Sequence, residues 1–218
     1  MILKSRRSYK RESPSRDAKS IYIFCEGARR EYEYFKYFKE LDSRINVEIY
    51  ELDSQEDNSP LGLLEIAKES ILPGEKNSKP KYSFLEDDEV WLVFDRDHDR
   101  GNSRAPQIET IRNDCKKRAD WFIGLSNPCF EVWLYYHFSG EKPSFTGDDR
   151  SCNWKTFVHD VSNGGFDSRK HPVLIEQAIV NASMNFTDVD GEPTTGSTEV
   201  FKLAKTIFTF VRDKLSDE

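Results

Sequence analysis

Short apolar runs alternate with longer amphipathic segments between about residues 20 and 138 of the chain. Each apolar run has the length of one strand, as in "IYIFC" and "WFIGLS", whereas the segments between them repeat apolar residues at helical spacing. Such an alternation is typical of βαβ units and therefore predicts an α/β fold with a largely parallel sheet. The predicted strands span residues 21–27, 45–52, 89–95 and 121–126.

The predicted helices of this part lie between the strands, at residues 30–41, 60–72 and 105–120. Pro60 near the start of the second helix, and Pro73 and Gly74 after it, fit the two ends of that helix. The third strand, "EVWLVFD", is apolar on both faces, which predicts a central position with helices on both sides. The second strand alternates apolar and polar residues and is expected nearer an edge of the sheet.

The alternation of predicted strands and helices ends after Gly140. Before that point, residues 127–138 predict a buried helix with Pro128 at its first position, and Ser126 and Asn127 are its candidate caps. The later predicted helices span 154–161, 171–186 and 197–215, the last with Ser197 or Thr198 as its cap. The chain is thus expected to comprise a basic flexible arm at 1–19, an α/β domain at 20–138 and a helical C-terminal region at 139–218 packed on it.

The composition is that of a globular protein, since 37% of the 218 residues are hydrophobic and 33% are charged. No apolar run approaches the ~20 residues that cross a bilayer, and the N-terminal segment lacks the apolar stretch of a signal peptide. A cytoplasmic protein with no membrane partner is therefore expected. The four cysteines form no CxxC pair and fit no zinc-site spacing, so we expect buried, reduced thiols.

The net charge of −7 is unevenly distributed. Residues 1–20 carry seven basic and two acidic side chains, and Arg6 and Arg7 are among the basic ones. A flexible basic arm on an acidic body can contact the phosphates of a nucleic acid. A solvated tail without a partner is an equally good interpretation of a segment rich in Ser, Pro and charge.

Acidic residues follow three of the predicted strands. Glu26 ends the first strand, Asp95, Asp97 and Asp99 follow the third, and Glu131 comes shortly after the fourth. In a parallel sheet these strand ends share one edge, where functional residues gather. Carboxylates placed together repel one another unless a cation compensates, and their hard oxygens favour Mg²⁺, Mn²⁺ or Ca²⁺. The sequence therefore predicts a metal site, and Mg²⁺ with few protein ligands suits it best.

The three aspartates do not form a calcium loop of the EF-hand type. Counted from Asp95, the sixth position of such a loop would be Arg100 instead of Gly, and the twelfth would be Pro106 instead of Glu. The calcium-loop interpretation is therefore excluded.

Glu131 is the only Asp, Glu, Lys or Arg residue between Pro128 and Phe138. A carboxylate in so apolar a run is expected to be buried and to need a partner. Arg96 and the predicted metal are the two candidate partners.

Gly27 permits a tight turn between the first strand and the first helix. The turn lets an anion such as a phosphate approach the start of the helix beside Arg29 and Arg30. The same arginines can instead pair with Glu33 or with another nearby acid. The sequence leaves both interpretations open.

Three blocks of the sequence, "IYIFCEGARREYEYF", "VWLVFDRDHDR" and "GLSNPCFEVWLYYHF", resemble the signature blocks of the RloB-like family. This family includes the second component of the AbiL abortive-infection system, and its members occur in prokaryotic defence loci. The resemblance implies a core similar to the Toprim fold, with a parallel sheet of about four strands flanked by helices. A weaker similarity to the C-terminal block of the family covers "EPTTGSTEVFKLAKTI".

The resemblance also implies roles for the matching acidic residues. Glu26 matches the Toprim glutamate, which acts as a general acid or base or as a metal ligand. Asp95 and Asp97 match the DxD pair that binds Mg²⁺, and Asp99 matches the third acid of a longer DxDxD form.

Two further glutamates match the family. Glu31 matches a second family glutamate one helical turn into the first helix, and Glu131 matches the acid of the "NPCFE" block, so both are candidate metal ligands. Arg30 is a departure, because the family usually has Thr at that position.

Together the residues and the resemblance predict a Mg²⁺- or Mn²⁺-dependent nuclease that cleaves DNA or RNA in anti-phage defence. Glu26, Asp95 and Asp97 are its predicted catalytic residues. Arg29, Arg30, Arg96 and the basic arm are predicted to hold the nucleic-acid backbone. The alternative is a non-catalytic metal-binding subunit that docks and regulates a separately encoded ATPase, since the chain has no P-loop motif of its own.

Overall fold

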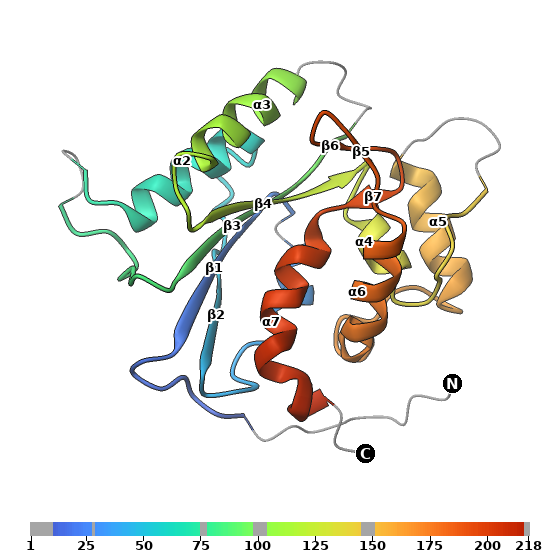
Figure 1. Cartoon of the computed structure of the whole chain (residues 1–218), viewed down its shortest axis with the longest axis horizontal. Coiled ribbons are helices and arrows are strands. Elements are labelled where there is room, and N and C mark those ends of the chain that lie inside the picture. Colours follow the sequence, from blue (N-terminus) through green and yellow to red (C-terminus); the bar gives the residue numbers. More distant parts are fainter. Residues whose placement is uncertain (1–10, 28, 75–77, 98–103, 145–150, 216–218) are drawn as a thin grey trace.

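A five-stranded sheet forms the centre of the protein in a computed structural model that describes residues 11–27, 29–74, 78–97, 104–144 and 151–215. The strand order is β2-β1-β3-β4-β7 (Figure 1). The first four of these strands are parallel, and β7 runs antiparallel to β4. Their bounds are β1 (Lys19–Cys25), β2 (Ile45–Ile49), β3 (Glu89–Asp95), β4 (Trp121–Asn127) and β7 (Ser197–Thr198). The predicted α/β fold is confirmed, with β3 central and β2 at the edge.

Helices cover both faces of the sheet (Figure 1). One face is covered by α2 (Pro60–Ile71) and α3 (Arg104–Cys115). The other is covered by α1 (Arg30–Lys36), α4 (Glu131–Tyr135), α6 (Ile175–Met184) and α7 (Val200–Leu215). The remaining elements are α5 (Ser151–Val161), which packs on α4, the 3₁₀ helix His171–Leu174, and the hairpin of β5 (Asp188–Val189) and β6 (Glu192–Pro193).

The side chains of the central strands alternate between two hydrophobic cores. In β3, Trp91 and Val93 belong to the core under α1, α4, α6 and α7, whereas Leu92 and Phe94 belong to the core under α2 and α3. Successive side chains of a strand point to opposite faces, so a strand buried on both faces must be apolar throughout. This is why "EVWLVFD" correctly predicted a central strand.

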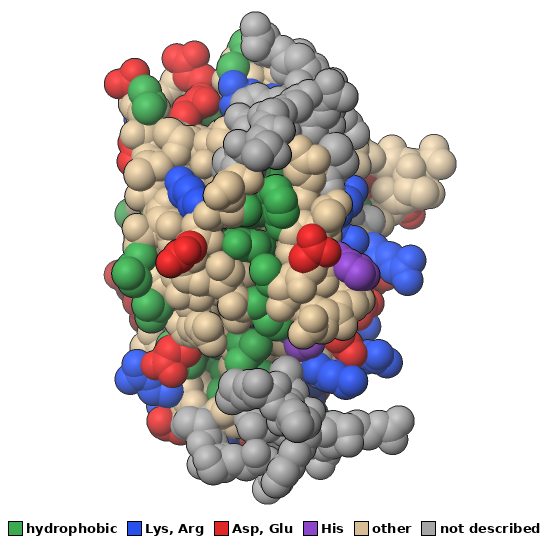
Figure 2. All heavy atoms as spheres, turned by 90° about the vertical axis from the view of Figure 1, so that its right-hand side faces the viewer, with side chains coloured by type: hydrophobic (Ala, Val, Ile, Leu, Met, Phe, Trp, Pro, Cys, Tyr) green, Lys and Arg blue, Asp and Glu red, His purple; other side chains and the backbone are tan. Residues whose placement is uncertain are grey.

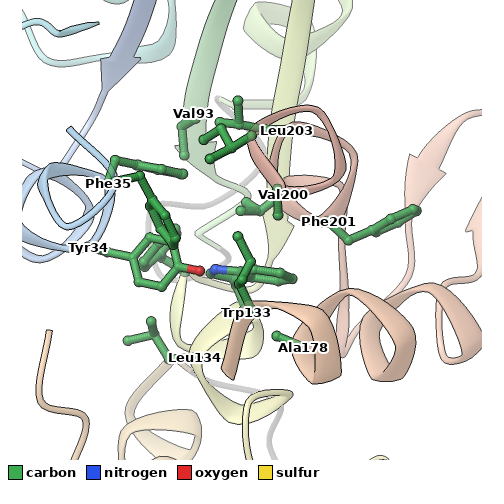
Figure 3. Packing of buried hydrophobic residues seen from close by; sticks show 14 of the residues in the cluster. Tyr34, Phe35, Val93, Trp133, Leu134, Ala178, Val200, Phe201 and Leu203 are labelled. Atoms are coloured by element: carbon green, nitrogen blue, oxygen red, sulfur yellow. The ribbon is translucent and has the colours of Figure 1, made fainter. Parts of the chain in front are cut away.

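The larger core brings the C-terminal helix onto the sheet. Figure 3 shows Tyr34 and Trp133 in this core together with Val93 of β3 and Val200 of α7. Gly124 of β4 allows the close approach, because a Cβ at that position would lie 3.2 Å from Val93 Cγ2 and 3.7 Å from Val200 Cγ2. The missing side chain therefore lets β4 and α7 pack directly against each other.

Two predicted helix starts are wrong. Ser126 and Asn127 are the last residues of β4, so α4 begins only at Glu131, and they pair with Thr198 and Ser197 of β7. Because these residues form a strand, α7 also begins later than predicted, although Thr198 Oγ1 still accepts a hydrogen bond from Val200 N. The strands β5, β6 and β7 were not predicted.

The structure also bears on the cysteines and on membrane-spanning helices. Cys25, Cys115 and Cys129 are buried and take part in no disulfide within the described residues, as predicted, whereas the side chain of Cys152 is outside the described part. In that same part of the chain, no helix combines the length and apolar character needed to cross a membrane.

Candidate functional site

The carboxyl ends of β1, β3 and β4 lie side by side at one edge of the sheet. Glu26 follows β1, and its N–H donates a hydrogen bond to Val93 O of β3 at 2.9 Å. Asp95 is the last residue of β3, and Glu131 begins α4 just after β4. The predicted convergence of acidic residues at one edge therefore has a structural basis in the strand order β1-β3-β4.

Glu26 is held by an arginine that the sequence did not single out. Arg104, the first residue of α3, donates from Nη2 to Glu26 Oε1 at 2.5 Å and from Nη1 to Glu26 Oε2 at 2.7 Å. It also donates to Asp95 O at 2.8 Å, and its Nη2 lies 3.8 Å from Asp97 Oδ2. Arg104 is only 2% exposed, and its hydrogen bonds to Glu26 raise the pKa of its guanidinium. A buried cation thus already neutralises Glu26.

Glu31 lies against Gly27 in the same region. A Cβ at Gly27 would overlap the Glu31 carboxylate, so any other residue at this position would displace the Glu31 side chain. Glu31 is buried, and this burial, followed by the charges of Glu131 and Glu26, raises the pKa of its carboxyl to about 7. Burial and the two neighbouring carboxylates therefore outweigh the opposing charge of Arg30 on Glu31.

Asp95 is in a similar electrostatic position. Burial of its carboxyl raises its pKa well above the usual range, and the charges of Glu31, Glu26 and Glu131 raise it further, while Arg104 opposes them. Its N–H donates to Glu26 Oε2 at 3.2 Å, which ties the end of β3 to the Glu26 carboxylate. Neither Glu31 nor Asp95 has an ion pair with another residue in the described part of the chain.

Glu131 is buried, as its apolar surroundings predicted, and pairs with Arg30. The Arg30 side chain is 52% exposed, so the pair connects the buried carboxylate to the surface. Arg30 was not among the predicted partners. The predicted arginine partner, Arg96, is wrong, because its Nε lies 3.4 Å from Glu192 Oε2 of β6.

A cavity of about 550 Å³ collects most of the predicted site residues. It is lined by Gly27, Arg29, Arg30, Glu31, Asp95, Asp97, Cys129, Phe130, Glu131 and Lys155. Glu26 is not among its lining residues, and Arg96 lines a different cavity, of about 820 Å³, next to the β5–β6 hairpin. Lys155 of α5 was missed because no local pattern marks one surface lysine among many. Asp99, Arg6 and Arg7 lie outside the described residues.

The carboxylates of this cavity suit a hard divalent cation with few protein ligands better than an ion that protein ligands enclose completely. Within the described ranges, no three or more His, Cys, Asp or Glu side chains are grouped so that they could hold a metal ion. Mg²⁺ commonly takes only one or two protein carboxylates and keeps its waters. Glu31 and Asp95 offer two such carboxylates, and burial together with neighbouring carboxylates raises the pKa of each.

No curated protein and no solved structure matches the chain. A family model described as RloB-like protein does match it, over residues 21–207. This range covers most of the chain and includes Glu26, Glu31, Asp95, Asp97 and Glu131. The chain therefore belongs to the RloB-like family.

Proposed function

We propose that the protein is a Mg²⁺- or Mn²⁺-dependent nuclease that hydrolyses phosphodiester bonds of DNA or RNA. The observation that carries this proposal is one cavity with two kinds of group. Glu31 and Asp95 supply carboxylates without a cationic partner, and Arg29 and Lys155 supply basic side chains beside them. Uncompensated carboxylates attract a divalent cation, and the basic side chains attract the phosphates that such a cation binds.

In this proposal Asp95 and Glu31 hold the metal, with Asp97 and Glu131 at the edge of the same cavity. The bound metal would polarise the scissile phosphate and lower the pKa of a water molecule. Asp99, if it joins the site, does so from outside the described part of the chain.

Glu26 has a positioning role in this arrangement. Both of its oxygens accept hydrogen bonds from Arg104, and one of them also accepts the Asp95 N–H, so it fixes the end of β3. The prediction that Glu26 moves a proton or binds metal requires Arg104 to release it. As long as the pair persists, Asp95 is the better candidate for the metal.

The basic residues of the cavity would hold the nucleic-acid backbone. Arg29 and Lys155 are exposed, whereas the charge of Arg30 is offset by Glu131. Arg96 is 14% exposed at its side chain and pairs with Glu192, so it contributes less to this surface. The role of Arg6 and Arg7 in backbone binding stays a prediction.

Cleavage assays test the proposal directly. We expect the full chain to cleave labelled DNA or RNA pools in Mg²⁺ or Mn²⁺, and we expect Asp95→Asn and Asp97→Asn to lose at least about 100-fold in rate. Asp160→Asn, at an exposed position of α5, is the matched control and should keep the wild-type rate. Full cleavage by Asp95→Asn would exclude the proposal.

Membership of the RloB-like family supports a role in prokaryotic anti-phage defence. We expect cells that carry the intact locus to restrict phage growth and cells with the Asp95→Asn chain to lose this protection. Protection that survives Asp95→Asn would separate the defence role from this site.

A second candidate is a non-catalytic subunit that binds a defence ATPase. Val180 and Met184 of α6 are 49% and 77% exposed. Figure 2, which views the side of the molecule where α5 lies, shows hydrophobic side chains along the middle of that face with charged side chains around them. Such a surface suits a protein partner. Cleavage that appears only when the ATPase is added would favour this candidate.

A further inference from the structure

A second cavity adjoins the acidic one. It has a volume of about 620 Å³ and lies between the start of α1, α4, α5 and the segment 165–168. Four residues, Arg29, Arg30, Glu131 and Lys155, line both cavities, so the two form one continuous depression. A ligand that reaches the carboxylates can therefore extend into the second cavity.

The boundary between the cavities is basic. Arg29 and Lys155 are exposed and have no ion pair with any residue in the described part of the chain. Arg30 is partly neutralised by Glu131. Two cations without an ion pair that line the same two cavities suit a phosphate group, because they attract its charge without first having to break an existing pair.

The floor of the second cavity is apolar. Leu134 and Val158 are buried there, and Phe166 is partly exposed. The Phe166 ring is fixed by edge-to-face contacts, with its centroid 5.0 Å from that of His137 and 5.2 Å from that of His171. An aromatic ring that lines a cavity and is held by its neighbours is a candidate stacking partner for a nucleobase.

We propose that this second cavity receives one unpaired base of the substrate strand while the adjoining phosphate binds between Arg29 and Lys155. This inference rests on the proposed nuclease function and adds a substrate class to it: a single strand, or a strand with an unstacked nucleotide. The volume of the second cavity agrees with this substrate. At about 620 Å³ it falls in the range of small-ligand sites, so it holds a nucleotide but no stacked duplex. A base inside a duplex must first leave its stack, which penalises fully paired substrates.

Binding measurements without catalysis test this inference. Fluorescence anisotropy of the full chain in EDTA compares a short single-stranded oligonucleotide, the same strand with abasic positions, and its blunt duplex. We expect the single strand to bind about tenfold more tightly than the duplex and than the abasic strand. Phe166→Leu keeps an apolar side chain but removes the ring, so it should weaken binding of the intact strand and leave binding of the abasic strand unchanged.

Charge variants test the phosphate half of the site. Lys155→Glu should weaken binding of all strands about tenfold and reduce the salt dependence of binding. Lys205→Glu on α7 makes the same charge change away from the cavity and should bind like the wild type. Thermal melts of each variant show whether the fold is kept.

The outcomes separate this inference from the nuclease proposal. Equal affinity for intact and abasic strands, or a Phe166→Leu effect that is the same on both, would overturn the base site even if the protein cleaves nucleic acid. A free nucleoside monophosphate serves as a competitor of the strand for binding. If its Kd equals that of the strand, the cavity binds single nucleotides and its assignment to a nucleic-acid strand is overturned. Base-dependent binding that Phe166→Leu removes would support the base site even if no cleavage is found.

Discussion

Arg104 and Glu26 form a buried, two-contact ion pair at the carboxyl edge of the sheet, with the Arg104 side chain 3% exposed and the Glu26 side chain 13% exposed. The same guanidinium donates to the backbone of Asp95, so one arginine joins the ends of β1 and β3. The pair gives the acidic edge an internal cation before any metal is considered.

Loss of Arg104 should destabilise the protein strongly. In Arg104→Ala, Glu26 becomes a largely buried carboxylate without a cationic partner, and we expect the free energy of unfolding to fall by about 3–5 kcal/mol. Urea denaturation measures this change. Arg169→Ala, which removes an arginine 84% exposed and paired with Asp167, should unfold like the wild type. Equal effects of the two substitutions would contradict a structural role for the buried pair.

Glu31→Gln should stabilise the protein at neutral pH. The folded-state pKa of Glu31 is raised to about 7 from 4.5, so the folded chain binds its proton more tightly and wild-type stability falls as pH rises through that window. Glutamine carries no charge, so the variant should gain up to about 3 kcal/mol over the wild type at pH 8 in EDTA and almost nothing below pH 4.5. Thermal or urea unfolding across this pH range measures the difference, and a gain independent of pH would refute the electrostatic cause.

Mg²⁺ should stabilise the wild type through Asp95. At ten times its Kd, a ligand specific for the folded state adds about 1.4 kcal/mol, which corresponds to a rise in Tm of about 3–5 °C for a chain of this size. In Asp95→Asn the rise should disappear, because one of the two uncompensated carboxylates is lost. Differential scanning fluorimetry with Mg²⁺ and with K⁺ at equal ionic strength measures the shift. The same rise in both proteins would place the ion elsewhere.

His137 should make the protein sensitive to acid. Burial lowers the pKa of His137 to about 3, and its ring is fixed between Trp133 O at 3.0 Å from Nδ1 and Tyr34 Oη at 3.1 Å from Nε2. Since the unfolded histidine takes up a proton near pH 6.5 and the folded one does not, stability is lost as pH falls below that value. We expect wild-type stability to fall by about 1–3 kcal/mol more than that of His137→Gln between pH 6.5 and 4.5. Parallel pH profiles of the two proteins would contradict this assignment.

The central strands could be predicted from the sequence because burial on both faces leaves a continuous apolar run. The bounds of β3 are those of "EVWLVFD", and the alternating second strand is indeed at an edge. The strands β5, β6 and β7 were missed because each has only two residues, which is too short for any periodicity. A two-residue strand depends on its neighbours in space, and these are far away in the sequence.

The acidic residues of the candidate site could be predicted from the sequence, but the arginines that form ion pairs with them could not. The burial of Glu131 followed from its isolation in an apolar run, yet its partner is Arg30 and not Arg96, because partner choice depends on the turn after β1. Arg104 carried no signal beyond its place just before a predicted helix. An arginine at a helix start that follows an acidic strand end is a pattern that could have suggested the Glu26 pair.

The strand pairing of β7 also links the acidic edge to the order in which the chain is synthesised. Asp97 N donates to Pro128 O at 3.0 Å, and the preceding Asn127 is held by Pro193 O, which accepts from its Nδ2 at 2.7 Å, and by the N–H of Gly196 at 2.8 Å. The described carboxylates of the edge all lie at or before residue 131 of the sequence, but the contacts that fix Asn127 require residues 193–198. A nascent chain that stops before this segment carries the acids without their support. The contacts that hold Asn127 therefore form only after residues 193–198 have been synthesised.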